Sequence, residues 1–159
     1  MKKYFWMIIA LILFSIPIIA CSGSTTAPAT SSSPDVVITL ERTACKGTCP
    51  VYTLTINGTG FVIYEGKEFV KTTGKVESNI GKEKVQQLVS EFEIINYFSL
   101  KDSYMEVTIT DFPNVNTSIN LNGRTKIIKH YRGDLNAPKP LTELEDKIDE
   151  IVNSAQWIK

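Results

Sequence analysis

Two cysteines close together are the residues most able to do chemistry in this chain of 159 amino acids. The segment CKGTCP runs from Cys45 to Pro50, so that Cys45 and Cys49 enclose a turn that contains a glycine. Cysteines at this spacing can reach bonding distance, and secretion would hold them in an oxidising compartment. We therefore expect a local disulfide between Cys45 and Cys49. Because the enclosed loop is short, the disulfide should add only about 2 kcal/mol to the free energy of unfolding.

The same cysteines leave a soft-metal site as an alternative. CxxxC followed by proline resembles the copper-binding motif of envelope copper chaperones that help to assemble cytochrome oxidase, in which a distant histidine is the third ligand. The chain has one histidine, His130, and two thiolates with an imidazole suit copper or zinc. Those chaperones, however, place a helix after the motif, whereas residues 51–56 have the composition of a strand. His130 is also explained as a polar residue on the water-facing side of a sheet.

Patterns of known catalytic sites are absent from the sequence. Thiol–disulfide catalysis uses CxxC at a helix N-terminus, and this chain has neither that spacing nor that helix. With one histidine and no GxSxG, HExxH, SxxK or glycine-rich phosphate loop, we expect a non-enzymatic protein with no cofactor. Asp111 is explained as a turn residue before Pro113. We expect the remaining acidic residues near the C-terminus to form the solvated side of a helix: Glu143, Glu145, Asp146, Asp149 and Glu150.

The N-terminus has the pattern of a secretory signal peptide, with Lys2 and Lys3 before an apolar run over residues 4–20. The last residues, Ile18-Ile19-Ala20-Cys21, resemble a bacterial lipobox. That resemblance implies cleavage before Cys21 and attachment of a diacylglyceryl group and palmitate-type acyl chains to Cys21, which anchor a protein without a spanning helix. A plain signal anchor with a chance cysteine is the alternative. We expect a lipid-anchored protein in the bacterial cell envelope that faces the periplasm or the exterior.

Composition divides the rest of the chain into a tether and one domain. Residues 22–34 contain only Ser, Thr, Gly, Ala and Pro, so we expect 21–34 to be a lipidated, flexible tether and 35–159 to be a single globular domain. The whole chain has 17 basic and 17 acidic residues. Cleavage removes Lys2 and Lys3 and leaves a net charge of 15 − 17 = −2. Without a basic stripe, nucleic acid is not an expected partner.

Hydrophobic periodicity predicts an α+β domain. Two helices are expected, over 81–96 and over 141–152, each with one apolar stripe, and Pro140 suits the first turn of the second. Asn57-Gly58 and Asn122-Gly123 are hairpin signals. We therefore predict an antiparallel sheet of about five to six strands, a meander plus a hairpin, with both helices packed on one face. The predicted strands are 36–42, 50–56, 60–65, 69–78, 115–121 and 124–132.

Alternation within these strands separates an apolar side from a polar side. Val36, Ile38 and Leu40 represent the apolar side, which Thr117 alone interrupts. The polar side should face water, either simply solvated or offering hydroxyl and amide groups to a glycan or a peptide. Its predicted members are Thr39, Glu41, Thr53, Thr55, Asn116, Ser118, Asn120, Arg124, Lys126, His130 and Arg132.

Several of these motifs together resemble an uncharacterised family of bacterial lipoproteins that share a domain of unknown function. The resemblance covers residues 36–157 and is strongest in CKGTCPVY (45–52), which fits a CxGxCPxY signature; the TDFP stretch (110–113) and Trp157 support it. It implies the lipoprotein class and the fold, and it carries over no catalytic or ligand residue. We expect a membrane-anchored envelope lipoprotein that acts as a non-enzymatic binding or interaction module for an envelope protein or a glycan. Copper handling through the CxxxCP motif and a role as a peripheral subunit of an envelope enzyme or transporter are the alternatives.

Overall fold

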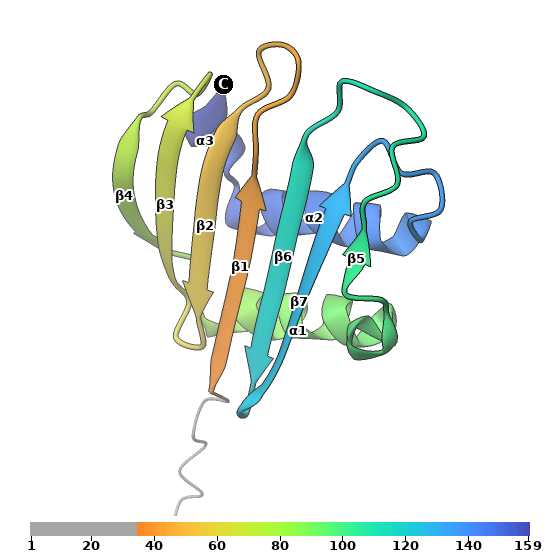
Figure 1. Ribbon diagram of the computed structural model, residues 1–159. Coiled ribbons are helices and arrows are strands. Elements are labelled where there is room, and N and C mark those ends of the chain that lie inside the picture. Colours follow the sequence, from red (N-terminus) through yellow and green to blue (C-terminus); the bar gives the residue numbers. More distant parts are fainter. Residues whose placement is uncertain (1–34) are drawn as a thin grey trace, which may run out of the picture. The chain divides into compact units, whose positions relative to one another are not determined.

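The computed structural model describes residues 35–159 of the chain. The predicted signal peptide (1–20) and the whole predicted tether (21–34), including the predicted lipid-attachment residue Cys21, lie outside the described residues. The described part contains one sheet and two long helices (Figure 1). Its elements, in chain order, are β1 (Val36–Arg42), β2 (Val51–Asn57), β3 (Phe61–Glu68), β4 (Gly74–Asn79), α1 (Lys82–Ile94), η1 (Tyr97–Ser99), β5 (Ser103–Tyr104), β6 (Asn114–Leu121), β7 (Arg124–Tyr131), α2 (Lys139–Val152) and α3 (Ala155–Ile158).

The sheet is open, and its seven strands lie in the order β4-β3-β2-β1-β6-β7-β5. Strands β1 to β4 form an antiparallel meander, and the β6–β7 hairpin joins it because β6 pairs with β1. The predicted α+β class is confirmed. The prediction of five to six antiparallel strands was incomplete, because the two-residue strand β5 runs parallel to β7 and makes the sheet mixed. Two residues are too few to show an alternating pattern.

Two turns depend on residues that tolerate a positive φ. In the β6–β7 turn, Asn122 has a φ of 52° and Gly123 a φ of 83°, as an Asn-Gly hairpin requires. In the β2–β3 turn, Gly60 has a φ of 90°. A Cβ atom on Gly60 would lie 2.6 Å from a backbone atom of Gly81, the residue that precedes α1. The β2–β3 turn therefore packs directly against the start of α1.

The core lies between the sheet and the two long helices, which cover the same face of the sheet (Figure 1). The predicted apolar side of β1, β2 and β6 faces this core. Thr117 is buried there because its hydroxyl lies 2.7 Å from the hydroxyl of Tyr97 in a hydrogen bond. Within residues 35–159, no helix combines the length and the apolar composition of a membrane span. Fully buried core residues include Ile38, Leu40, Leu54, Ile56, Ile119, Leu88, Leu141 and Ile148.

Strand β7 corrects the sequence prediction of the sheet faces. Lys126 pairs with Ile119 and His130 pairs with Val115. Because paired residues of antiparallel strands lie on the same side of a sheet, these two polar side chains face the helices rather than water. His130 is only 1% exposed, whereas Ile127, on the other side, is 55% exposed. These polar side chains can face the helices because each finds a hydrogen-bond partner there. For example, the Lys126 ammonium group donates to the Leu100 carbonyl at 2.6 Å.

Candidate functional site

The cysteine pair lies in the loop between β1 and β2. Cys45 and Cys49 are placed as a disulfide, with their Cα atoms 5.6 Å apart. The start of this loop is held to the first residue of β6, because the backbone N–H of Thr43 donates to the Asn114 carbonyl at 3.0 Å. At its tip, Lys46 and Asp111 form an exposed ion pair at 3.8 Å. The structure thus joins the two cysteines as the spacing predicted and places their loop beside the segment that precedes β6.

His130 is not brought to the cysteines. It lies on the helix side of the sheet, where its Nδ1 atom forms a hydrogen bond of 2.7 Å with Oε1 of Glu145. The prediction that His130 faces water is therefore wrong. Within residues 35–159, no group of three His, Cys, Asp or Glu side chains is arranged to hold a metal ion. The ligand set of the copper hypothesis, Cys45, Cys49 and His130, is not assembled.

Glu145 also lies elsewhere than its sequence pattern predicts. We predicted it on the solvated side of the last helix, but its side chain is completely buried. A signal for this was present in the sequence. Leu141, Leu144 and Ile148 define the apolar stripe of α2, and at 3.6 residues per turn position 145 falls on that same stripe. The residue type points the other way, because an acidic residue is seldom buried without a charged partner, and the partners of Glu145 come from distant parts of the chain.

Glu145 lies at the centre of a charged cluster between α2 and the inner face of the sheet. Its Oε2 atom accepts a hydrogen bond of 2.8 Å from Nη1 of Arg132, so that both carboxylate oxygens are engaged. Arg42 in β1 and Arg132 directly after β7 thus supply the guanidinium groups, and two successive turns of α2 supply the carboxylates. We define the charged cluster as Arg42, His130, Arg132, Glu145, Asp146 and Asp149.

Arg42 forms the second half of the charged cluster. Its guanidinium donates to Asp149 at 2.8 Å and to Asp146 at 3.0 Å, and Arg132 contacts Asp146 as well at 3.2 Å. Burial by itself would lower the pKa of Arg42, but the neighbouring Asp149 carboxylate holds that pKa above its ordinary value. Arg42 therefore stays charged and fastens the end of β1 to α2.

Tyr52 and Ser154 complete the environment of Asp149. The Tyr52 hydroxyl and the Ser154 hydroxyl each donate to Oδ1 of Asp149 at 2.6 Å. Burial and the negative charge of Asp149 both raise the pKa of Tyr52, which keeps the phenol protonated. The carboxylates of α2 are thus paired with groups on the sheet, so that their charges are compensated. These pairs fix the position of α2 on the sheet.

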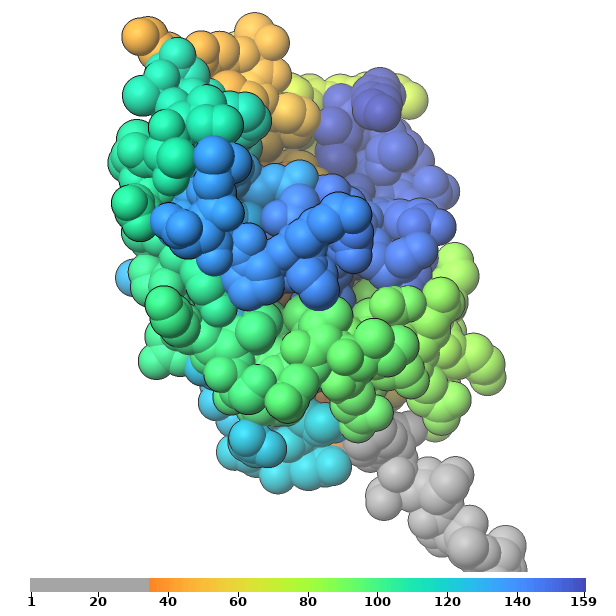
Figure 2. All heavy atoms as spheres, turned by 90° about the vertical axis from the view of Figure 1, so that its right-hand side faces the viewer, coloured from red at the N-terminus to blue at the C-terminus, as the bar shows by residue number. Residues whose placement is uncertain are grey.

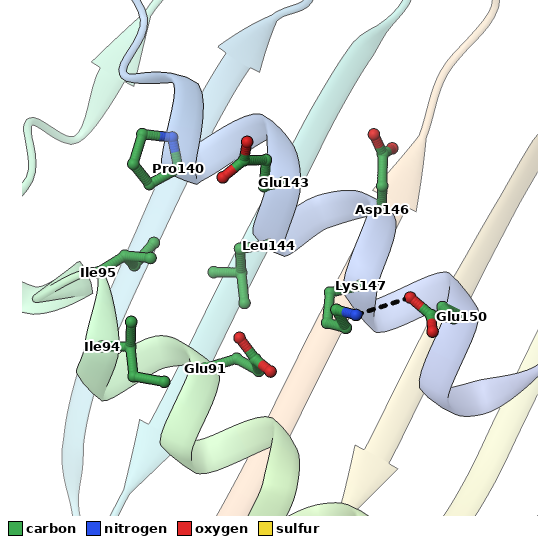
Figure 3. Close-up of a pocket in the computed structure, with 9 residues that line it drawn as sticks. All are labelled: Glu91, Ile94, Ile95, Pro140, Glu143, Leu144, Asp146, Lys147 and Glu150. Atoms are coloured by element: carbon green, nitrogen blue, oxygen red, sulfur yellow. Dashed lines mark hydrogen bonds and ion pairs between the residues drawn. The ribbon is translucent and has the colours of Figure 1, made fainter.

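On the outer side of α2, a groove of about 580 Å³ lies between α1 and α2 (Figure 3). Figure 2 shows the start of α2, in blue, directly above the end of α1, in green. Asp146 belongs both to the charged cluster and to the lining of the groove. The helices run in opposite directions, since Glu91 lies toward Lys147 while Ile95 lies toward Pro140. The groove is lined by Glu91, Ile94, Ile95, Pro140, Glu143, Leu144, Asp146, Lys147 and Glu150.

The groove has an apolar floor and an acidic rim. Ile94 lies at the edge of the groove, at the end of α1, and is 75% exposed, the largest exposed fraction among the large apolar residues of the described part. The floor consists of Leu144, which is buried and lies on α2 across the groove in Figure 3, and of half-buried Ile95. Lys147 donates to Glu150 at 2.8 Å, and that contact raises the pKa of Lys147. Asp146 points away from the floor, toward its arginine partners.

The opposite face of the sheet is the second extended surface. Figure 1 shows both long helices behind the sheet and no described element across its front. The predicted polar residues of β1 and β6 meet there. The hydroxyls of Thr39 and Ser118 lie 2.6 Å apart, and the Asn116 amide donates to Glu41 at 2.9 Å. These groups bind one another across the strands, and exposed Ile127 interrupts the polar surface.

The fold and the groove define a small α+β domain in which two antiparallel helices cover one face of an open sheet. Residues 36–152 match the model of a family described as a domain of unknown function, DUF6438. Since this match spans well over half of the chain, the protein belongs to the DUF6438 family. None of the curated proteins matches the chain. Membership of an uncharacterised family, as the sequence motifs indicated, is thereby confirmed.

Proposed function

We propose that this protein is a bacterial envelope lipoprotein, anchored by acyl chains on Cys21, whose domain is a non-enzymatic binding module. The anchoring part rests on the N-terminal sequence. Lys2 and Lys3 precede the apolar run over 4–20, and the run ends in Ile18-Ile19-Ala20-Cys21. Two or more acyl chains on one cysteine are sufficient for stable membrane attachment.

The disulfide supports an envelope location. Cys45 and Cys49 are placed as a disulfide in the described loop. Disulfides persist in oxidising compartments such as the periplasm and the cell surface and are rare in the cytosol. The geometry of the loop and the sequence of the N-terminus therefore favour the same compartment.

One observation carries the binding proposal, namely the groove between α1 and α2. It opens to solvent, it combines apolar and charged groups, and Ile94 at its edge is 75% exposed. Beneath it, Glu145 uses both carboxylate oxygens to hold His130 and Arg132. We assign these buried charged groups to the positioning of α2, and the groove to the recognition of a partner.

Lipid attachment is tested by metabolic labelling with palmitate and by membrane fractionation. The wild-type chain should incorporate the label and sediment with membranes, and a Cys21→Ala variant should lose the label. Equal labelling of the Cys21→Ala variant would refute lipid attachment at this residue.

Binding through the groove is tested by photo-cross-linking in living cells. A photoreactive amino acid replaces Ile94 in the groove or, as a matched control, Ile127 on the open sheet face; these isoleucines are 75% and 55% exposed. We expect adducts with an envelope partner from position 94 and none from position 127. Adducts from position 127 alone would transfer the binding role to the sheet face, and the absence of adducts from both positions would overturn the binding proposal.

A further inference from the structure

We infer that the groove between α1 and α2 binds a cationic amphipathic peptide segment of an envelope partner, in which Lys or Arg side chains stand next to aliphatic ones. This inference rests on the proposed function of the domain as a binding module. It adds the chemistry of the partner, which follows from the charge of the rim, the apolar surface of the floor and its exposed edge, and the shape of the groove.

Charge at the rim favours a cation. Three glutamates line the groove, Glu91, Glu143 and Glu150. They stand against Lys147 in the lining and against Lys139, which pairs with Glu143 at 3.0 Å, so that the rim carries −3 + 2 = −1. Asp146 is left out of this sum because Arg42 and Arg132 already contact its carboxylate. Lys147 pairs with Glu150 at 2.8 Å. A positively charged segment would therefore meet net negative charge along the groove, which speeds its association and fixes its orientation.

The floor requires an apolar component in the partner. Ile95 on α1 and Leu144 on α2 face each other across the floor, and Ile94 extends this apolar surface to the exposed edge at the end of α1 (Figure 3). Covering an exposed isoleucine removes apolar surface from water and is favourable. Lys and Arg side chains suit such a site, because their methylene stems can lie on the floor while their charged ends reach the rim.

The shape of the groove fits a segment of polypeptide. Pro140 and Glu150 mark its two ends along α2 and are ten residues apart, which corresponds to about 15 Å at the helical rise per residue. This length matches about three turns of a helix lying between two helices, a common mode of peptide recognition. A small amine would leave most of the apolar floor uncovered.

The same charges argue against a lipid surface as the occupant. Bacterial membranes that contain anionic lipids attract basic segments, whereas the rim of this groove carries glutamates. Glu91 and Glu143, on opposite sides of the groove, would both be placed against anionic headgroups. A protein segment of opposite charge is the occupant that the rim favours.

The test uses the full-length lipoprotein in nanodiscs of zwitterionic lipid and a fluorescent helical peptide composed of Lys and Leu. Matched peptides carry Gln or Glu in place of Lys, and empty nanodiscs provide the blank. Binding is followed by fluorescence anisotropy at low and at high salt. The Lys peptide should bind more tightly than the Gln peptide, the Glu peptide should bind least, and the difference should shrink at high salt because exposed charges are screened.

Matched substitutions locate the binding. The groove variant combines Glu91→Gln with Glu143→Gln, and the control variant combines Glu83→Gln with Glu93→Gln, two exposed carboxylates of α1 that do not line the groove. The groove variant should bind the Lys peptide roughly fivefold more weakly, the scale expected for two exposed charge contacts. The control variant should bind as the wild type does.

The outcomes separate this inference from the proposed function. Equal loss of binding in both variants, or equal binding of the Lys and Glu peptides, would overturn the inference. If a photoreactive group at position 94 still captured a partner in that case, the groove would bind a partner of another chemistry and the proposed function would stand. If position 94 captured nothing and the peptides did not bind, both would be refuted.

Discussion

Removal of the Glu145 carboxylate is the perturbation that most directly tests the charged cluster. In Glu145→Ala, His130 loses its partner at 2.7 Å and Arg132 loses its partner at 2.8 Å. A hydrogen bond to a charged group contributes about 1.5 to 3 kcal/mol to stability, and the loss of one partner of a buried ion pair costs about 3 to 5 kcal/mol. Arg132 keeps Asp146 and the Thr142 carbonyl as acceptors, so we expect the lower part of that range, about 3 kcal/mol.

The assay is urea denaturation followed by far-ultraviolet circular dichroism, with Glu143→Ala as the matched control. Glu143 lies on the same helix, but its ion pair with Lys139 is exposed, so its removal should change the free energy of unfolding by less than about 0.5 kcal/mol. A loss below about 1 kcal/mol in Glu145→Ala, or equal losses in the two variants, would refute the assignment of Glu145 as the buried centre of the cluster.

Three further predictions follow from the structure. Burial raises the pKa of Tyr52 and that of Tyr97. Above pH 10 the unfolded chain releases these protons and the native chain retains them, so the free energy of unfolding should fall by about 1.4 kcal/mol per pH unit for each tyrosine. Urea titrations at several pH values measure this slope, and Tyr52→Phe should flatten it. Gly60→Ala, which meets a positive φ and the backbone before α1, should cost about 2 to 4 kcal/mol in the same assay, and an unchanged midpoint would contradict the described packing. Thiol alkylation with mass spectrometry should find Cys45 and Cys49 blocked until a reductant is added. Replacing both by Ser should lower the free energy of unfolding by about 2 kcal/mol. Free thiols in protein taken from the envelope would overturn the disulfide and call for copper titration.

The features that were predicted well are those decided by neighbouring residues. The helix expected over 81–96 is α1, at Lys82–Ile94, because its apolar positions recur at helical spacing. Asn122 and Gly123 adopt the positive φ angles that their turn requires. The cysteine pair depends only on a turn of a few residues. Each of these signals can be read within one short window of sequence.

The orientation of β7 could not be read in this way. Ile127 and Ile128 are adjacent and point to opposite sides, so the strand's own alternation does not say which side is buried. Pairing with β6 decides it, since Val115 places His130 on the helix side. The polar imidazole is tolerated there because Nδ1 of His130 lies 2.7 Å from Oε1 of Glu145, on the facing helix. Both residues can be buried because they form a hydrogen bond with each other, and they are 15 residues apart in the sequence.

By itself, the sequence determined the local elements, the α+β class, the cysteine turn and the N-terminal pattern that underlies the proposed anchor, because periodicity, turn chemistry and short motifs are local. The tertiary structure alone decided the charged cluster and the groove. Both arise where α2 is laid across the sheet and beside α1, which brings Arg42 to Asp149 and Ile94 to Leu144. Residues that far apart in sequence become neighbours only through strand register and helix packing, which no short window of sequence contains.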